Sequence, residues 1–544
     1  MQHSAQATRR WPISQHATAV LLLAGMAQAL SLAWPFDGAF KGDAQGWLQC
    51  LSLAVLAFHI DRSQSGKEAF VKAWVFALAW LAGSIWWLFI SMHRYGGLAA
   101  PVAGLAVGLM AGGLALFYAA AAAVYHAICK TGVGVLPRAG AFAAVWVLAE
   151  MVRGTLWTGF PWGAVGYAHV DSLLQHWAPW MGVYGLCALS AFMAMAVAAE
   201  RKDNRPATRA TQLVVAAIVA VLGYTWFMSP SQSVDEEALS KKPLSVTLLQ
   251  GNIPQDLKFG EGVSLALRDY REALLSSTSD LTVTPETAIP LIQQQMPDHY
   301  WSQLETHFSK GKQAALIGLP LAQRSEQGQL QYSNSAIALM PQTTPASTAS
   351  YQYDKHHLVP FGEFVPPLFQ WFVRMMNIPL GDFNRGDVAQ PSFVFKGERI
   401  APNICYEDLF GEELARSLAD PDKAPTLMVN LSNIAWFGDT VAIDQHLHIS
   451  RMRALELGRP MLRATNTGAT AIINAQGQVT HRLPSAVQGA LTAEVYGVHG
   501  PITPYASWVS VWGLWPLTGL ALLTLCIVAA MAHASRHGQR RFGP

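Results

Sequence analysis

A single cysteine, Cys405, lies where an apolar run that predicts a β-strand meets two acidic residues, in the stretch NICYEDLF. A cysteine becomes a nucleophile only as the thiolate, so it needs a base or a positive charge close by. A thiol without such neighbours behaves as a small hydrophobic side chain. Taken alone, the residue leaves both interpretations open.

Two other stretches carry groups that could complete such chemistry. Glu286 follows a predicted strand in TPETAIP, and Lys355 lies in YDKHHLVPFGEFVPP. Glu286 could take the thiol proton, and Lys355 with the backbone N–H of Tyr406 could stabilise an oxyanion. A glutamate that acts on a thiol needs a desolvated site, which leads us to expect a raised pKa at Glu286. Glu286 as a helix N-terminal acid and Lys355 as a surface charge are the alternatives.

Several histidines invite a metal site, but their spacing does not favour one. His356 and His357 are adjacent on an extended run and would face opposite ways. Asp444, His446 and His448 alternate, yet they fall in a stretch with helical periodicity. The chain also lacks the Walker, HExxH, GxSxG and GxGxxG motifs. We expect neither a metal nor an organic cofactor.

The composition is that of a membrane protein. Of the 544 residues, 51% are hydrophobic and only 13% are charged, about half the usual share of charged residues in soluble domains, which is roughly 25%. The net charge of +2 says nothing about nucleic acid, and no basic stretch with interleaved aromatics indicates it as a partner.

The apolar residues are concentrated in eight runs. About 20 apolar residues span a bilayer as a helix, so we expect seven spans in residues 1–240, a soluble domain at 241–500, and a last span with a tail at 501–544. The runs cover 17–34, 47–60, 71–92, 98–128, 139–155, 178–199, 211–228 and 507–532.

Lysine and arginine are unequally distributed between the two sets of helix ends. Cytoplasmic ends carry the excess of these residues, so both termini are expected in the cytoplasm and the soluble domain on the periplasmic side of a bacterial inner membrane. The rich set is Arg9, Arg10, Arg62, Lys67, Lys72, Lys130, Arg138, Arg201, Lys202, Arg205, Arg209, Arg536, Arg540 and Arg541, and the poor set is Lys41, Arg94 and Arg153.

This topology makes Cys405 the one cysteine of the exported domain. The other four, Cys50, Cys129, Cys187 and Cys526, fall inside or at the edges of apolar runs. Cysteines in an oxidising compartment usually form disulfides. An unpaired exported thiol is therefore either buried and inert or kept for its reactivity.

The soluble domain alternates short apolar runs with helical periodicity, which predicts a layered α/β fold. Strands are expected at 244–250, 281–284, 314–319, 334–340, 399–405, 426–431 and 469–474, and helices at 263–277, 298–310, 409–419 and 443–457.

The stretches TPETAIP, YDKHHLVPFGEFVP and NICYEDLFGEE, in this order, resemble the Glu-Lys-Cys signature of the carbon–nitrogen hydrolase (nitrilase) superfamily. With the predicted spans, and with QGNIPQDLKF, GFPWGAVGY, SNIAWFG, RMRALELGRPMLRATNTG and TPYA, the chain resembles the bacterial apolipoprotein N-acyltransferase family. This resemblance implies an eight-helix membrane bundle joined to an exported nitrilase-like αββα sandwich.

The resemblance also assigns roles. Cys405 would be the nucleophile, Glu286 the base and Lys355 the oxyanion stabiliser, while Glu363 would be a second essential acid. Tyr406 and Glu407 match positions that the family needs beside the nucleophile. Substrate contacts would come from Phe259, Trp371, Phe372 and Trp436. The family commonly has Trp at positions 259 and 284 and Asp at 434, where this chain has Phe259, Thr284 and Ile434.

Residues 361–383 are too apolar for a solvated loop. They could form a packed core helix, or a mobile arm that dips toward the membrane and lines the acyl path.

The implied reaction has two steps. Cys405 takes an acyl chain from a phospholipid as a thioester, and the amino group of a diacylglyceryl-cysteine on a lipoprotein then accepts it. The implied partners are therefore these two lipids and the bilayer, and we expect a monomer.

Two other functions stay open. The first is a membrane-tethered nitrilase-like amidase, in which water reaches the thioester. The second is a transporter or scaffold with an inactive domain. The intact Glu286, Lys355 and Cys405 argue against the second, as does an expected lack of acid–base pairs within the membrane.

Overall fold

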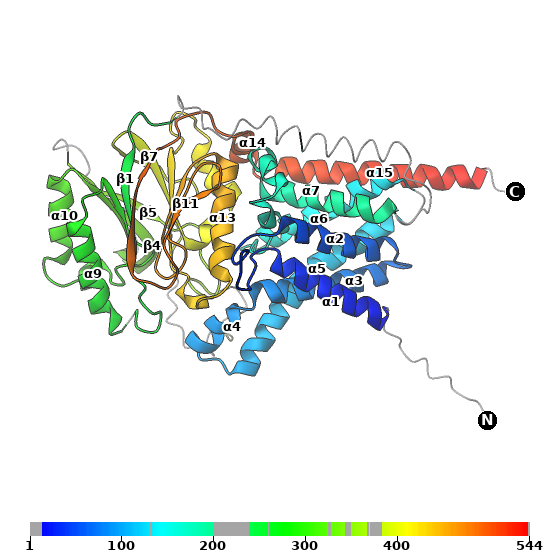
Figure 1. The fold of residues 1–544 in the computed structure, drawn as a ribbon, viewed down its shortest axis with the longest axis horizontal. Coiled ribbons are helices and arrows are strands. Elements are labelled where there is room, and N and C mark those ends of the chain that lie inside the picture. The colour runs from blue at the N-terminus through cyan, green and yellow to red at the C-terminus, as the bar shows by residue number, and fades with distance from the viewer. Residues whose placement is uncertain are drawn as a thin grey trace.

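The computed structural model describes residues 13–129, 133–200, 223, 239–258, 260–324, 328–342, 350–366, 369, 371 and 383–541. A bundle of apolar helices lies beside an α/β domain (Figure 1). The predicted span at 211–228, apart from position 223, and the candidate residues Phe259 and Phe372 lie outside the described residues.

The helical part coincides with the predicted apolar runs. Five described helices are long and apolar enough to cross a membrane, whereas α1 and α2 have 16 residues each. At 1.5 Å per residue, 16 residues reach about 24 Å of a hydrocarbon layer that is about 30 Å thick. Several apolar helices are present, and the count of eight spans stays a prediction. The bounds are α1 Gln15–Leu30, α2 Gly46–Asp61, α3 Gly66–Ile85, α4 Leu88–Ile90, η1 Ser91–Tyr95, α5 Ala100–Cys129, α6 Val135–Thr155, η2 Val165–His169, η3 Leu173–Trp177, α7 Ala178–Glu200, α14 Pro504–Trp512 and α15 Trp515–Arg541.

The expected absence of acid–base pairs among these helices is wrong. Arg153 and Glu150 form a fully buried ion pair at 2.6 Å on α6, and Arg138 pairs with Asp61 at 3.0 Å. Arg153 also donates hydrogen bonds to backbone carbonyls of the loop after α6, including that of Trp162 at 2.9 Å. This pair therefore holds a loop in place, and its role is structural.

The α/β domain is a sandwich of two six-stranded sheets. The first has the order β12-β1-β2-β3-β4-β5, and the second has the order β11-β10-β9-β8-β7-β6. The first sheet contains β1 Leu244–Gln250, β2 Leu281–Val283, β3 Ala314–Arg324, β4 Leu330–Leu339, β5 Ser350–Asp354 and β12 Gly489–Val495. The second contains β6 Phe393–Phe395, β7 Glu398–Ile404, β8 Leu427–Ser432, β9 Met461–Thr465, β10 Ala471–Ile473 and β11 Val479–Arg482.

Helices cover the outer faces of both sheets. Helices α9 (Gly262–Ser276) and α10 (Tyr300–Lys310) pack on the first sheet, and α13 (Ala442–Leu457) lies between the second sheet and the membrane helices (Figure 1). Strand β8 is buried at every position, as expected for a parallel strand covered on both faces. The layers are those of a nitrilase-like α/β domain.

The strands and helices predicted for the α/β domain are all found, with one change. The helix expected at 409–419 is split into η6 (Cys405–Leu409), α12 (Gly411–Leu414) and η7 (Ala415–Leu418). The structure adds β5, β6, β9, β11 and β12. These are short or edge strands, and β9 also carries the charged Arg463, which hides its apolar pattern.

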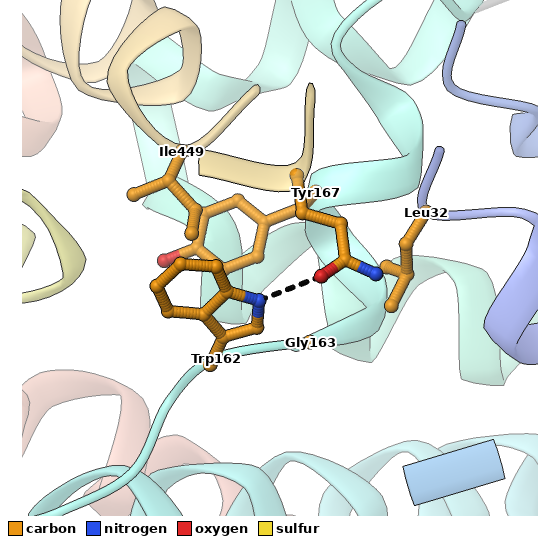
Figure 2. Close-up of a pocket in the computed structure, with 6 residues that line it drawn as sticks. Leu32, Trp162, Gly163, Tyr167 and Ile449 are labelled. Carbon is orange, nitrogen blue, oxygen red and sulfur yellow. Dashed lines mark hydrogen bonds between the residues drawn. The ribbon is translucent and has the colours of Figure 1, made fainter. Parts of the chain in front are cut away.

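Helix α13 joins the two parts of the molecule. The Gln445 side-chain oxygen accepts hydrogen bonds from the indoles of Trp162, at 2.8 Å, and Trp87, at 3.2 Å. Figure 2 shows Trp162, Tyr167 and Ile449 gathered around a cavity of about 10 Å³ at this junction, roughly the room that one water needs. These buried polar contacts help to fix how the sandwich sits on the bundle.

We predict that Gln445→Leu lowers the free energy of unfolding by about 1–3 kcal/mol, because the Trp162 indole N–H stays buried without its acceptor. Thermal unfolding in detergent measures the change. Gln303→Leu, at an exposed position of α10, is the matched control. Equal stability of the two variants would contradict the prediction.

Candidate active site

The three residues predicted to react follow strands of both sheets. Glu286 lies three residues beyond the end of β2, Lys355 directly follows β5, and Cys405 directly follows β7. Because β2 and β5 belong to one sheet and β7 to the other, the site is assembled where the two sheets face each other. Ser432 Oγ lies 3.4 Å from Sγ of Cys405, and the N–H of the next residue, Asn433, donates to Glu286 at 2.9 Å. Because Glu286 also lies 3.1 Å from the Lys355 ammonium, the three groups form one cluster.

The Lys355 ammonium is shared between two carboxylates. It lies 3.1 Å from Glu286 Oε1 and 3.0 Å from Glu363 Oε1, and its side chain is fully buried. Asn334, on β4, donates through Nδ2 to the same two oxygens, at 2.8 Å and 2.6 Å. The side chains of Lys355 and Asn334 therefore hold both acids in place, and the pKa of Lys355 is raised because the acids outweigh its burial.

Glu286 is ionised rather than poised as an acid. Its second oxygen accepts the backbone N–H of Asn433 at 2.9 Å. Burial alone would raise the pKa of this carboxyl, but the ammonium groups of Lys355 and Lys258 and the bond from Asn334 outweigh it and lower the pKa. The expectation of a raised pKa at Glu286 is therefore wrong. The sequence alone did not reveal that two cations, Lys355 and Lys258, lie beside this carboxylate.

Cys405 occupies a strained turn. Its φ is 53°, an uncommon value for a residue other than glycine, and the thiol is partly buried. Ser432 lies with its hydroxyl 3.4 Å from Sγ. Burial and then the charge of Glu286 raise the pKa of the thiol to about 12, although Lys355 acts in the opposite direction. At rest the Cys405 side chain is therefore a neutral thiol, which would need a base to react as a nucleophile.

Glu407 ties the Cys405 turn to the Lys355 loop. One carboxylate oxygen accepts the backbone N–H of Ile404 at 2.5 Å and the Tyr353 hydroxyl at 2.9 Å. The other accepts the backbone N–H groups of His356 and His357, at 2.7 Å and 3.2 Å. Four hydrogen-bond donors point at this buried side chain. Only a carboxylate offers two oxygens that can accept all four bonds at this position.

Tyr406 and the Lys355 loop also contact the helical part. The Tyr406 hydroxyl donates to the Gly159 carbonyl at 3.2 Å, and His357 Nε2 lies 2.8 Å from the Thr158 carbonyl. Nδ1 of His357 faces Glu413 at 3.0 Å. The loop between α6 and η2 therefore lies directly against the residues that flank Lys355 and Cys405.

Asp408, His446 and His448 make structural contacts away from the cluster. Asp408, which follows Glu407, is buried against His446 Nε2 at 2.8 Å and Arg463 Nη1 at 3.0 Å. His448 Nε2 lies 2.8 Å from the Gly42 carbonyl. Among the described residues, no group of three His, Cys, Asp or Glu side chains is arranged to hold a metal ion.

Of the remaining predicted residues, one lies in the cluster and the others lie elsewhere. Glu363 joins the Lys355 cluster and accepts the Val359 N–H at 2.8 Å through Oε2. Trp436 is partly buried, with its ring 5.7 Å from that of Tyr95. Trp371 is 60% exposed, which does not fit a packed core helix at that position.

Sequence reasoning missed Asn334, Lys258 and Asn433 as members of the cluster. Lys258 and Asn433 lie inside stretches that carry the family resemblance, QGNIPQDLKF and SNIAWFG, which is a usable signal. Asn334 lies within a strand with nothing around it in sequence to mark its role.

Comparisons with known proteins cover both parts of the chain. Residues 17–196 match the family model of the apolipoprotein N-acyltransferase N-terminal domain, and residues 245–497 match the carbon–nitrogen hydrolase model. Three similar relatives are named apolipoprotein N-acyltransferase. The protein from Verminephrobacter eiseniae is 51% identical, over 91% of this chain and 92% of its own. The protein from Ralstonia nicotianae is 44% identical, over 92% of both chains. The protein from Bordetella bronchiseptica is 39% identical, over 96% of this chain and 97% of its own.

We predict that Cys405 alkylates slowly at neutral pH and that its rate keeps rising beyond pH 10. With a pKa near 12, about one thiol in ten thousand is ionised at pH 8. Peptide mass spectrometry after iodoacetamide treatment, with glutathione as the reference thiol, follows the rate. A plateau below pH 9 would show that the thiol is already activated at rest.

Proposed function

This chain belongs to the apolipoprotein N-acyltransferase family, and we propose that it moves an acyl chain from a phospholipid to the N-terminal amine of diacylglyceryl lipoproteins. The observation that carries the proposal is the convergence of Glu286, Lys355 and Cys405 beside a loop of the apolar helices. A thiol, a base and a cation are the groups needed to make and release a thioester.

The first step forms the acyl-enzyme. Glu286 takes the thiol proton as Sγ of Cys405 attacks the ester carbonyl, and Lys355 stabilises the oxyanion. Because the thiol pKa is high and the carboxyl pKa is low, proton transfer accompanies formation of the C–S bond instead of preceding it. When the ester C–O bond breaks, the proton on Glu286 passes to the departing lysophospholipid alkoxide.

The second step releases the acyl chain. The lipoprotein amine attacks the thioester carbonyl, the C–N bond forms and the C–S bond breaks. Glu286, ionised again, takes a proton from the amine and returns it to the Cys405 thiolate. The products are an amide-linked acyl chain and the free enzyme.

Exposed tryptophans support a membrane surface at the level of the site. Trp47, Trp86, Trp157, Trp180 and Trp515 are all exposed, and each lies at the end of a helix nearest the α/β domain. Tryptophan is enriched at membrane interfaces. From the distribution of lysine and arginine, we propose that the α/β domain lies on the periplasmic face of a bacterial inner membrane, with both termini in the cytoplasm and with domain limits at 240 and 500.

A monomer suffices for this chemistry, since every group named in the site comes from one chain. The alternative amidase function differs only in the acceptor, because water instead of an amine would take the acyl group from the thioester.

We predict that purified protein incubated with a phospholipid labelled in its acyl chain carries a hydroxylamine-sensitive label on Cys405, and that Cys405→Ser carries none. A diacylated lipopeptide should then move the label onto its own amine. Mass spectrometry of the peptide and the lipopeptide follows both steps. Equal labelling of the two proteins would exclude the thioester, and release of the label as free fatty acid would favour the amidase.

We further propose that Phe369 and Trp371, in the stretch 361–383 that we call the arm, contact the membrane and guide the acyl chain. Residues 367, 368, 370 and 372–382 of this stretch lie outside the described residues. Phe369 and Trp371 are 40% and 60% exposed, and a large exposed apolar side chain in an exported segment suits a lipid surface.

We predict that Trp371→Asp lowers the rate of acyl-enzyme formation about tenfold or more, because inserting a charge into the membrane interface costs free energy. Val394→Asp, at a 64% exposed position on β6, is the matched control and should leave the rate unchanged. Normal acylation by a folded Trp371→Asp protein would count against the arm.

A further inference from the structure

The catalytic cluster contains a second buried lysine, Lys258, in the loop that follows β1. Only 3% of its surface is exposed, and its Nζ donates a hydrogen bond to the backbone oxygen of Glu286 at 3.2 Å. Among the described residues this carbonyl is its hydrogen-bond partner, so two of the three ammonium donors remain available. Lys258 is therefore anchored to the residue that supplies the base.

The charges around Lys355 do not balance by themselves. Its one ammonium faces two carboxylates, Glu286 and Glu363, and in the proposed mechanism the oxyanion that forms in this desolvated site takes up part of the same positive charge. Uncompensated charge in such surroundings is costly. Glu407 does not add to the imbalance in the same way, because its oxygens accept three backbone N–H groups and a tyrosine hydroxyl.

Lys258 supplies the missing positive charge. Its ammonium acts directly on the Glu286 carboxylate and interacts with Cys405. The other groups that face Glu286 are Lys355, Asn334 and the Asn433 N–H. With both lysines charged, two ammonium groups balance two carboxylates.

We propose that Lys258 is a positioning residue of the acyl transfer, which keeps Glu286 ionised and oriented so that Lys355 can serve the oxyanion. Its hydrogen bond to the Glu286 carbonyl holds the backbone of Glu286 in place. When the Lys355 ammonium turns part of its interaction to the oxyanion, the positive charge of Lys258 continues to stabilise the Glu286 carboxylate. This inference rests on the proposed thioester mechanism, and it adds a cation that the Glu-Lys-Cys signature does not contain.

A consequence is a pH limit set by this lysine. Burial lowers the pKa of Lys258 to about 8, against the opposing influence of Glu286 and Cys405. The cation is therefore present below pH 8 and is lost as the pH rises through this value. The rate of acyl-enzyme formation should fall above pH 8 for the same reason.

The test is the pH profile of acyl labelling at Cys405, from pH 5 to pH 9.5, in the full-length protein. Lys258→Met should lose about tenfold or more in rate at pH 7, and its acidic limb should move up by about one pH unit or more, because Glu286 loses a neighbouring positive charge. Lys258→Arg, charged at every pH used, should recover most of the rate and lose the decline above pH 8. Lys312→Met, at an exposed position, is the control.

The outcomes separate this inference from the proposed function. If Lys258→Met folds and matches the wild-type profile while Cys405→Ser is unlabelled, the role of Lys258 is excluded and the thioester mechanism stands. If Lys258→Met does not fold, the Lys258→Arg profile decides, and an unchanged decline above pH 8 overturns the proposal. Labelling that persists in Cys405→Ser instead excludes the proposed function itself.

Discussion

The active site depends on one buried ammonium group, that of Lys355, held between the carboxylates of Glu286 and Glu363. A charged lysine inside a protein is tolerated only when it is paired and hydrogen-bonded. The two acids and Asn334 meet this need, and in return the ammonium keeps Glu286 ionised. The charge and orientation of the proposed base and of the proposed oxyanion stabiliser are therefore consequences of a single electrostatic arrangement, and removing one of its charged side chains leaves the charge of a partner uncompensated.

This arrangement explains why the thiol and the base are so far apart in proton affinity. Glu286 is ionised and Cys405 is protonated, so the resting site holds no thiolate. In the proposed mechanism, the thiolate forms only as an ester carbonyl is attacked. A neutral, buried thiol is protected from oxidation and alkylation, because those reactions need the thiolate.

The sandwich and the helical bundle are one structural unit. Helix α13 is buried on both sides, Gln445 bonds to two tryptophans of the helical part, and Tyr406 and His357 reach carbonyls of the loop after α6. The last two contacts flank Cys405 and Lys355. The position of the reacting groups relative to the apolar helices is thus set by short hydrogen bonds rather than by a flexible linker.

Much of this protein followed from its sequence, and the reasons are local. Apolar runs predicted the helices, and alternating periodicities predicted the main strands, because burial of one face depends on residue spacing alone. The resemblance carried by three stretches named Glu286, Lys355 and Cys405 before any geometry was known. The split of the helix predicted at 409–419, the short edge strands and the burial of the pair formed by Arg153 and Glu150 did not follow, since each depends on how other elements pack around it.

Only the tertiary structure decided how the reacting groups are charged. Asn334 and Lys258 come from outside the three signature stretches, yet together with Lys355 they act on Glu286 and turn an expected rise of its pKa into a fall. A sequence names the groups that can ionise. Their proton affinities depend on burial and on distances to other charges, and those exist only once the chain has folded.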